Sequence, residues 1–319
     1  MRHRRLSGAA FAMWVATSTA LTIAQQPAAP GAGQGQPAVF RGGVELMNLS
    51  VTVTDKKGRS VTDLTQDDFL VFEDKKPQTI VNFSSAKQAN TTPIGLGLVL
   101  DASMSMTSDR LQSMRIAVEG MVNNRLRKDD ELYLVEFNKD AKLTKEWTTD
   151  KRSVIDTIRR IKTHEGTAIY NAIMLSLPVS KQGRHKKQVM LVITDGGDTH
   201  STVSRADVAA AARASDVIIY ALVVDNEPGF YSKSDPTVRQ AASELARVTD
   251  ATGGRTQYVQ GLGELENAIE QLGKEFTQQY ELSYARGTDG RLHDIAVGVK
   301  RPDVSVRHRR AYQASEAPR

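Results

Sequence analysis

The sequence contains no cysteine in its 319 residues. The chain can therefore form no disulfide, no thiolate nucleophile and no zinc–sulfur site. This absence does not argue against export, because a chain of this length can bury a sizeable core without covalent staples. Apolar residues make up 40% and charged residues 25%, which are ordinary values for a globular protein.

Beyond residue 24 the sequence has no apolar run long enough to cross a membrane. The first 24 residues have a different composition, because three arginines among the first five positions precede the mostly apolar stretch 8–24. Small residues near Ala24 suit cleavage after it, and the stretch is short for a membrane anchor, the alternative. We expect a signal peptide at 1–24 and an exported mature chain that is periplasmic, surface-bound or secreted, with no membrane span after cleavage.

The net charge is less basic than it looks. The formal value of +5 falls to +2 without residues 1–24, because three arginines and no acid are lost. A basic run near the end lacks interleaved aromatic residues that could stack on bases. We interpret it as a solvated or edge-guarding strand and expect no nucleic-acid partner. The run consists of Arg301, Arg307, His308, Arg309 and Arg310.

Composition divides the chain into segments. Residues 25–38 contain only Pro, Gly, Ala and Gln and predict a flexible linker. An N-terminal β segment at 39–88 and a C-terminal one at 277–313 flank a central domain at 93–276, and a tail at 314–319 ends the chain. The strands expected in the flanking segments are 44–46, 49–54, 69–73, 79–83, 279–284, 292–299 and 304–312.

Strand-length and helix-length patterns alternate through the central domain. This predicts a doubly wound α/β fold in which helices cover both faces of a mostly parallel sheet. The expected strands are 94–100, 132–137, an edge strand at 141–148, 188–194, 217–224 and 257–259. The expected helices are 108–126, 152–161, 168–180, 206–214, 238–249 and 262–276. Each flanking β segment is too small to be stable alone, so we expect the two to pair into a sandwich-like subdomain.

Oxygen-bearing side chains follow the apolar strand 94–100, where a helix is about to begin. Asp101, Ser103 and Ser105 offer three oxygens at alternate positions of one tight loop. Ligands of open parallel sheets bind beyond the carboxyl ends of strands, and hard divalent cations prefer oxygen ligands. One loop cannot surround an ion, so other loops must contribute; Thr167 precedes a helix, and Asp195 follows the apolar strand 188–194.

Three motifs together resemble the metal ion-dependent adhesion site of von Willebrand factor type A domains: LVLDASMS, EGTAIYNAI and VMLVITDGGD. The resemblance covers about 93–276 in element order. Met104 departs from the small residue common at its position, but it is a spacer between ligands. The flanking segments resemble those of exported bacterial VWFA-related domain proteins, a label that names an architecture and no activity. The resemblance implies that one ion is held, partly through water, by Asp101, Ser103, Ser105, Thr167 and Asp195.

The resemblance implies a non-enzymatic, adhesion-type module. Two carboxylates balance one divalent cation, Mg²⁺ before Mn²⁺ or Ca²⁺, and leave it able to accept an Asp or Glu carboxylate from a protein partner. Asp198 is either a residue that supports a ligand or a plain loop residue. The sequence does not decide the partner, the metal or the oligomeric state.

Two alternatives remain. A metal-assisted hydrolase would need a general base beside the ion, for which only His164, Glu165 or His200 is placed. A structural envelope protein would use the ion to stabilise loops. The sequence has no G-x-S-x-G, Walker-type loop or G-x-G-x-x-G after a strand, and Gly95 and Gly97 lie inside a strand, where they indicate close helix packing.

Overall fold

The structure is a computed structural model, and it describes residues 45–89, 91–225 and 236–314. These residues belong to one compact unit of the chain, Val44–Arg319. The expected signal peptide, the linker and all of the tail except Ala314 lie outside the described residues.

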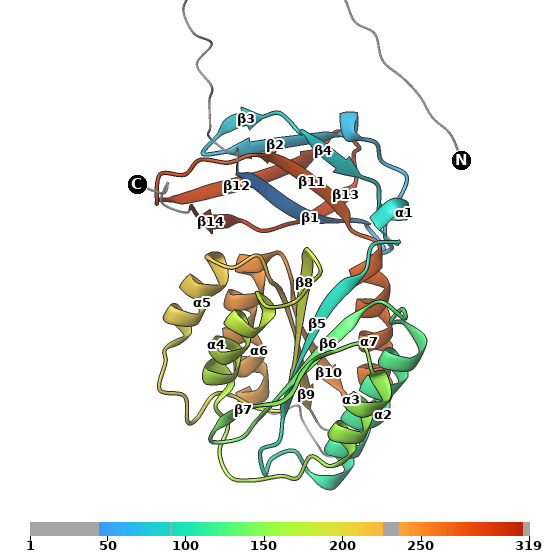
Figure 1. Cartoon of the computed structure of the whole chain (residues 1–319), viewed down its shortest axis with the longest axis vertical. Coiled ribbons are helices and arrows are strands. Elements are labelled where there is room, and N and C mark those ends of the chain that lie inside the picture. Colours follow the sequence, from blue (N-terminus) through green and yellow to red (C-terminus); the bar gives the residue numbers. More distant parts are fainter. Residues whose placement is uncertain (1–44, 90, 226–235, 315–319) are drawn as a thin grey trace, which may run out of the picture. The chain divides into compact units, whose positions relative to one another are not determined.

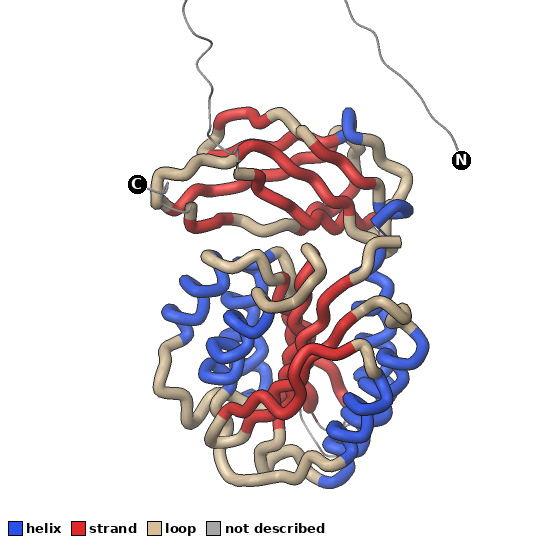
Figure 2. Tube along the Cα trace, viewed as in Figure 1, coloured by secondary structure: helices blue, strands red, loops and turns tan. Residues whose placement is uncertain are grey.

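A six-stranded sheet forms the centre of the described chain (Figures 1 and 2). Neighbouring strands are parallel except for the edge strand β7, which runs antiparallel to β6. In spatial order the strands are β10 (Thr256–Gln260), β9 (Ile218–Asp225), β8 (Lys187–Thr194), β5 (Ile94–Asp101), β6 (Glu131–Phe137) and β7 (Ala141–Thr148). The predicted mostly parallel sheet is confirmed.

Helices cover both faces of this sheet, as Figure 1 shows. One buried cluster joins the sheet to α2 (Ser108–Asn124), α3 (Lys151–Arg159) and α7 (Gly261–Thr277). A second cluster joins the other face to α4 (Ile169–Ser180), α5 (Arg205–Arg213) and α6 (Pro236–Thr249). Strand β5 is buried at every position because both of its faces are covered, which explains its continuous apolar sequence.

Gly97 in β5 makes room for a tyrosine of the neighbouring strand. A Cβ atom at this position would lie 2.2 Å from the Tyr133 ring. The Tyr133 hydroxyl lies 2.9 Å from the Ser180 Oγ and 3.2 Å from the Ser176 carbonyl oxygen, both in α4. Helix α4 packs against β5, as predicted, and the Tyr133 ring of β6 occupies the space that a side chain at Gly97 would fill.

The flanking segments form two further antiparallel sheets, each with four strands. The first has the order β13 (Val304–Arg307), β1 (Leu46–Asp55), β11 (Tyr280–Ala285) and β4 (Asn82–Ser84). The second has the order β14 (Ala311–Gln313), β12 (Leu292–Val299), β2 (Phe69–Glu73) and β3 (Lys76–Gln78). Their buried side chains form one hydrophobic cluster. Both sheets mix strands from the two ends of the chain, so the predicted pairing of the segments is confirmed.

Two predicted strands are wrong in detail. The expected strand at 79–83 is replaced by β3 and β4, which belong to different sheets. A hairpin turn with positive φ at Asp74 and Lys75 follows β2 and brings β3 back onto it, so the next strand begins at Lys76, before the expected position. The expected strand at 304–312 is likewise split into β13 and β14, because the chain crosses between the sheets at 308–310. A short helix, α1 (Ala86–Ala89), and two 3₁₀ turns at Gln66–Asp68 and Asp250–Thr252 complete the described elements.

The prediction of a solvated or edge-guarding strand at the C-terminal basic run holds in part: Arg307 lies in β13, an edge strand of its sheet, but two members of the run are not free in solvent. Arg309 is only 5% exposed, and its Nη1 donates to the Arg213 carbonyl oxygen at 3.0 Å. Arg307 forms an ion pair with Glu275 of α7. These arginines tie the β segments to the helices of the α/β part, a role that their sequence spacing does not reveal.

Within the described ranges, no helix is long and apolar enough to span a membrane.

Candidate functional site

The parallel pairing of β5 with β8 brings the two predicted acidic ligands to one edge of the sheet. Leu100 pairs with Ile193, so the two strands end at the same level. Asp101 is the last residue of β5, and Asp195 directly follows β8. Both are buried, at 0% and 2% exposure. Sheet register therefore places the two carboxylates together.

A chain of hydrogen bonds connects four of the five predicted ligands. The Ser103 amide donates to Asp101 Oδ1 at 2.7 Å, and the Ser103 and Ser105 hydroxyls lie 2.9 Å apart. The Ser105 hydroxyl donates to Asp195 Oδ1 at 2.8 Å. The Asp-x-Ser-x-Ser loop after β5 and the loop that begins at Asp195 after β8 thus form one polar cluster of oxygen atoms.

Thr194 belongs to the same cluster, although the sequence interpretation did not single it out. Its hydroxyl donates to Asp101 Oδ2 at 2.5 Å and lies 3.3 Å from both the amide nitrogen and the carbonyl oxygen of Gly196. Thr194 fixes the orientation of the Asp101 carboxylate. The sequence could have indicated this role, because Thr194 directly precedes Asp195 at the end of an apolar strand.

Thr167 lies on a loop that runs beside the Asp-x-Ser-x-Ser loop, since Ser103 and His164 form a parallel β-bridge. Gly166 has a φ of +79° and leaves no room for a side chain, because a Cβ would lie 2.7 Å from Lys139 Cβ. The Thr199 hydroxyl accepts from the Thr167 amide at 3.1 Å. Thr167 as a residue is 6% exposed, and among the hydrogen bonds of the described residues its hydroxyl takes part in none, so the structure does not join it directly to the other four ligands.

Asp198 holds the start of a helix. Its Oδ1 accepts from the Tyr170 amide at 3.3 Å and from the Ser201 hydroxyl at 2.5 Å. Because Tyr170 lies in the first turn of α4, directly after the Thr167 loop, Asp198 supports that loop. No described hydrogen bond joins Asp198 to the other acidic residues of the site.

The site concentrates negative charge in a buried place. Burial raises the pKa of Asp101 to about 6; the nearby Asp195 carboxylate also raises it, and the hydrogen bonds from Ser103 and Thr194 only partly oppose this. Burial likewise raises the pKa of Asp195, against the lowering effect of Ser105 and Arg110. The two charged carboxylates are therefore incompletely compensated by the protein.

Arg110 is the cation of this site, and the sequence interpretation missed it. Its Nη1 forms an ion pair with Asp195 Oδ2 and donates to the Ser105 carbonyl oxygen at 3.0 Å. The residue lies in the first turn of α2, where the helix dipole disfavours positive charge. A basic residue at that position was a signal that could have been noticed.

The candidate bases of the hydrolase alternative do not join the cluster. The His200 Nδ1 lies 2.8 Å from the Thr199 hydroxyl, and the Glu165 carbonyl oxygen accepts from the Lys139 amide at 2.9 Å. His164 and Glu165 have exposed side chains. In the described part of the chain, no hydrogen bond connects any of the three candidate side chains to Asp101 or Asp195.

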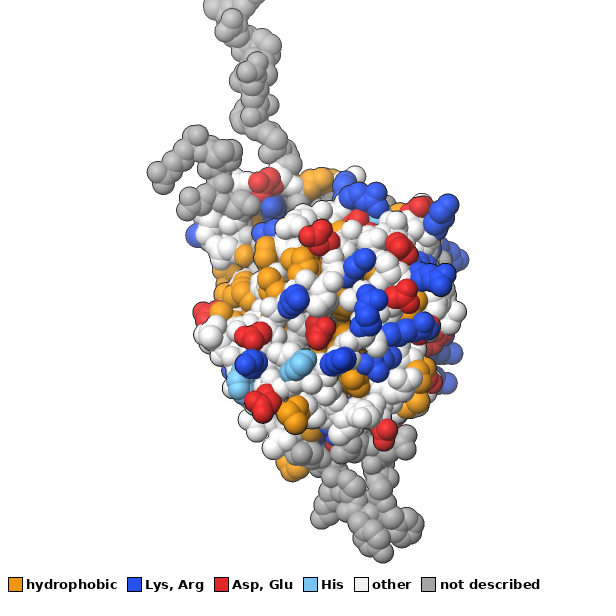
Figure 3. Space-filling model, turned by 60° about the horizontal axis from the view of Figure 1, so that its bottom comes forward, with side chains coloured by type: hydrophobic (Ala, Val, Ile, Leu, Met, Phe, Trp, Pro, Cys, Tyr) orange, Lys and Arg blue, Asp and Glu red, His pale blue; other side chains and the backbone are white. Residues whose placement is uncertain are grey.

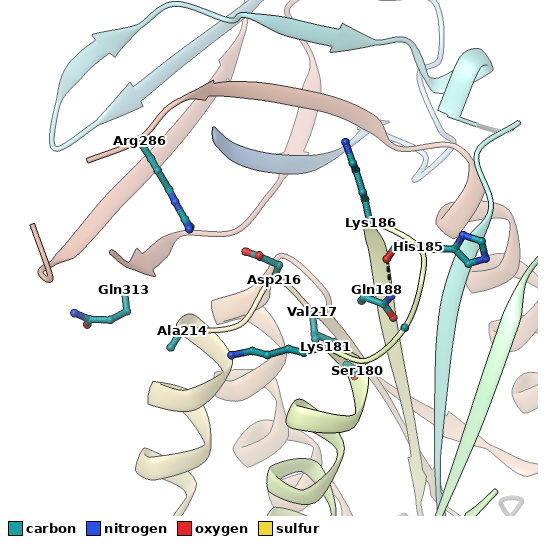
Figure 4. A pocket seen from close by; sticks show the side chains of 11 residues that line it. Ser180, Lys181, His185, Lys186, Gln188, Ala214, Asp216, Val217, Arg286 and Gln313 are labelled. Carbon is teal, nitrogen blue, oxygen red and sulfur yellow. Dashed lines mark hydrogen bonds between the residues drawn. The ribbon is translucent and has the colours of Figure 1, made fainter. Parts of the chain in front are cut away.

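A separate pocket lies at the amino ends of β8 and β9, away from the carboxylates (Figure 4). It is lined by charged side chains of both signs, including Lys181, Asp216 and Arg286. The Gln188 side-chain amide donates to the His185 carbonyl oxygen at 2.6 Å, as the dashed line in Figure 4 marks. The side chains spread around the pocket and do not converge on a point within it, so the carboxylate cluster remains the candidate site.

Comparisons with known proteins agree with this architecture. Residues 96–197, which contain all five predicted ligands, match the family model of the von Willebrand factor type A domain. A solved structure titled von Willebrand factor type A from Catenulispora acidiphila has a TM-score of 0.50 at 10% identity and covers 87% of this chain and 76% of its own. Residues 96–197 are thus similar to a von Willebrand factor type A domain, and the described chain shares the fold of that solved structure.

Two further proteins are similar to part of this chain. An uncharacterized protein of Synechocystis sp. is 30% identical over 116 residues, which cover 35% of this chain and 27% of the relative. This chain thus matches about a quarter of that relative's length. The conserved hypothetical protein BatB from Bacteroides thetaiotaomicron is 20% identical with a TM-score of 0.47, covering 58% of this chain and 97% of its own.

Proposed function

We propose that the carboxylate cluster binds one divalent cation and that the loaded site captures an acidic side chain of a protein partner. The single observation that carries the proposal is the meeting of two buried carboxylates with the Ser103 and Ser105 hydroxyls at the carboxyl edge of a parallel sheet. Under this proposal the protein is a non-enzymatic, adhesion-type binding module.

The donor set fits a hard cation. Every proposed ligand supplies oxygen: the carboxylates of Asp101 and Asp195 and the hydroxyls of Ser103, Ser105 and Thr167. Such oxygen sets, completed by water, are what Mg²⁺ takes in proteins, with Mn²⁺ and Ca²⁺ as alternatives. The raised pKa values of both carboxylates fit a site whose negative charge awaits a counter-ion.

The surroundings of the site suit an acidic protein partner. Met104 is 64% exposed between the two serine ligands and offers an apolar contact. Lys139 and Lys162 are exposed on neighbouring loops. Figure 3, which turns the lower end of Figure 1 forward, shows Lys and Arg side chains gathered over one side of this face. Basic surface around a cation site would speed the approach of an acidic ligand and add specificity.

The proposed place of action is outside the cytoplasm, on the basis of the basic and apolar composition of residues 1–24. In that setting the chain would meet its partner as a periplasmic, surface-bound or secreted protein. Cell fractionation with mass spectrometry of the N-terminal peptide tests this: a mature protein that begins at Gln25 is expected outside the cytoplasm, and a chain found only in the cytoplasm contradicts the proposal.

The proposal has two tests on the purified full chain. First, saturating Mg²⁺ should raise the free energy of unfolding by about 3 kcal/mol at a hundredfold excess over Kd. Asp101→Asn should abolish this stabilisation while the variant stays folded, because Asn can still accept from the Ser103 amide. No difference between Mg²⁺ and chelator would contradict the metal site.

Second, an array of acidic peptides, each paired with its Asp→Asn or Glu→Gln copy, tests ligand capture. Binding should require Mg²⁺ or Mn²⁺, prefer the acidic member of each pair and disappear in Asp101→Asn. Metal-dependent stabilisation without metal-dependent peptide binding would favour the structural role of the ion. Release of a cleaved peptide would favour the hydrolase.

A further inference from the structure

Arg110 contacts the residues of the proposed metal site directly. Its guanidinium reaches from the first turn of α2 to Asp195 Oδ2 and the Ser105 carbonyl oxygen. Both side chains are withdrawn from water, with 15% exposure for Arg110 and none for Asp195. The guanidinium thus occupies one carboxylate oxygen of a residue that we propose as a metal ligand.

This placement is costly for the arginine. The amino end of a helix carries partial positive charge, which repels a guanidinium. Its Nε is also buried and finds no hydrogen-bond partner in the described part of the chain. The attraction of Asp195 offsets these costs. Arg110 is therefore held in the site by the same negative charge that would attract a cation.

We propose that Arg110 is an internal competitor of the divalent cation, neutralising Asp195 in the ion-free site and withdrawing from its Oδ2 when the ion binds. The inference rests on the proposed metal site. A guanidinium and a divalent cation repel one another at the short distances of a shared carboxylate, and burial weakens the screening of that repulsion. Ion binding therefore includes the work of displacing Arg110.

Two consequences follow for the chain. The ion-free protein is stabilised by the Arg110–Asp195 pair, which gives one of the two buried carboxylates a counter-charge. The site also needs a higher concentration of free cation for loading than the same ligands would need without Arg110. Arg110 would in this way set the cation concentration at which the protein becomes able to bind its partner.

Calorimetric titration of Mg²⁺ and Mn²⁺ into the chelator-treated full chain tests the inference. Arg110→Gln removes the charge and keeps an amide that can donate to the Ser105 carbonyl oxygen, so cation affinity should rise at least about tenfold. Without metal, this variant should unfold at a lower urea concentration than the wild type. Arg115→Gln is the matched control, because Arg115 lies on the same helix and donates to the Ile161 carbonyl oxygen at 2.5 Å. Its cation affinity should equal that of the wild type.

The outcomes separate this inference from the metal site itself. Equal or weaker cation binding by Arg110→Gln, beside measurable binding by the wild type, overturns the competitor role and leaves the metal site standing. A gain of equal size in Arg115→Gln also overturns it, because the effect would then be only one of net charge. Absence of binding in every variant overturns both proposals. Binding by Arg110→Gln alone supports the competitor role.

Arg110→Lys provides a second test of the inference if Arg110→Gln does not fold. Lysine keeps the charge but is more strongly hydrated and lacks the planar fork, so it should leave Asp195 more readily. We therefore expect Arg110→Lys to bind the cation more tightly than the wild type, but less tightly than a site without a positive charge at position 110. An affinity at or below that of the wild type contradicts the inference.

Discussion

His293 shows how a single residue can couple two turns of the β sheets to pH. Its Nδ1 lies 2.8 Å from Asp74 Oδ2, and its Nε2 lies 2.8 Å from Asp289 Oδ1. Only the protonated imidazole can donate from both nitrogens. Burial alone would lower the pKa of His293, but the hydrogen bonds to Asp289 and Asp74 outweigh it and raise the pKa above the ordinary value.

The raised pKa predicts a loss of stability in mildly alkaline solution. A histidine with a higher pKa in the folded than in the unfolded state contributes its full stabilisation below the unfolded pKa of about 6.5. This contribution is lost as the pH rises through the folded pKa. Urea unfolding between about pH 6 and pH 9 should therefore show a declining midpoint. His293→Gln should have a lower midpoint at the acidic end and a flatter pH dependence; a wild-type decline that persists unchanged in the variant contradicts the assignment.

At the scale of the element, the end of α7 is held by polar contacts. Glu275 is nearly buried; its Oε1 accepts from the Tyr220 hydroxyl at 2.7 Å, and its carboxylate pairs with Arg307 and Arg255. The side chains come from β9, from β13 and from the turn before β10. One carboxylate thus connects the α/β part with the strands that follow it.

Loss of that carboxylate should be costly. Glu275→Ala is expected to lower the free energy of unfolding by about 2 to 3 kcal/mol, because Arg307 would keep a partly buried charge without its partner. Glu270 on the same helix is the control. It pairs with Arg125 and Lys274 at 38% side-chain exposure, so Glu270→Ala should cost less than about 1 kcal/mol. Equal losses in urea unfolding would contradict the special role of Glu275.

Strand β5 makes a second prediction at this scale. Gly97→Ala should destabilise the protein by about 2 kcal/mol, because the added methyl group would collide with the Tyr133 ring across two adjacent strands. Gly120→Ala in α2 has open space around the new Cβ and should be neutral or slightly stabilising. Thermal unfolding of the two variants compares the same chemical change in both places.

At the scale of the whole described chain, strands from both ends share each outer sheet. Strand β1 pairs with β11 and β13, and β2 pairs with β12. The α/β part is inserted between these strands in the sequence. The N-terminal strands therefore cannot complete their sheets until the last strands are present.

Truncation after Phe276 should expose this dependence. Without β11 to β14, strand β1 loses both neighbours and β2 keeps only β3, so residues 45–89 should become sensitive to protease while the α/β part resists longer. Limited proteolysis followed by mass spectrometry locates the cuts. Continued resistance of 45–89 in the truncated chain would show that the N-terminal strands are stable alone.

The central fold and most of the candidate site could be predicted because local sequence carries their signals. A strand buried on both faces must be apolar throughout, as β5 is, and polar residues that follow such a strand must lie at the sheet edge. Asp101 and Asp195 were predicted together on this ground. The split strands at 79–83 and 304–312 were missed, since a crossing between two sheets depends on partners far away in the sequence.

The sequence by itself determined the order of strands and helices and the chemical type of the site, because periodicity and strand ends are local properties. Only the tertiary structure decided which charges meet. Arg110 pairs with Asp195, and Thr194 donates to Asp101. Arg307 is partly buried and Arg309 is buried against the α/β part, although their sequence is typical of a solvated run. The reason is physical: the place of a long charged side chain depends on the counter-charge that packing brings within reach, and that partner has no fixed distance along the chain.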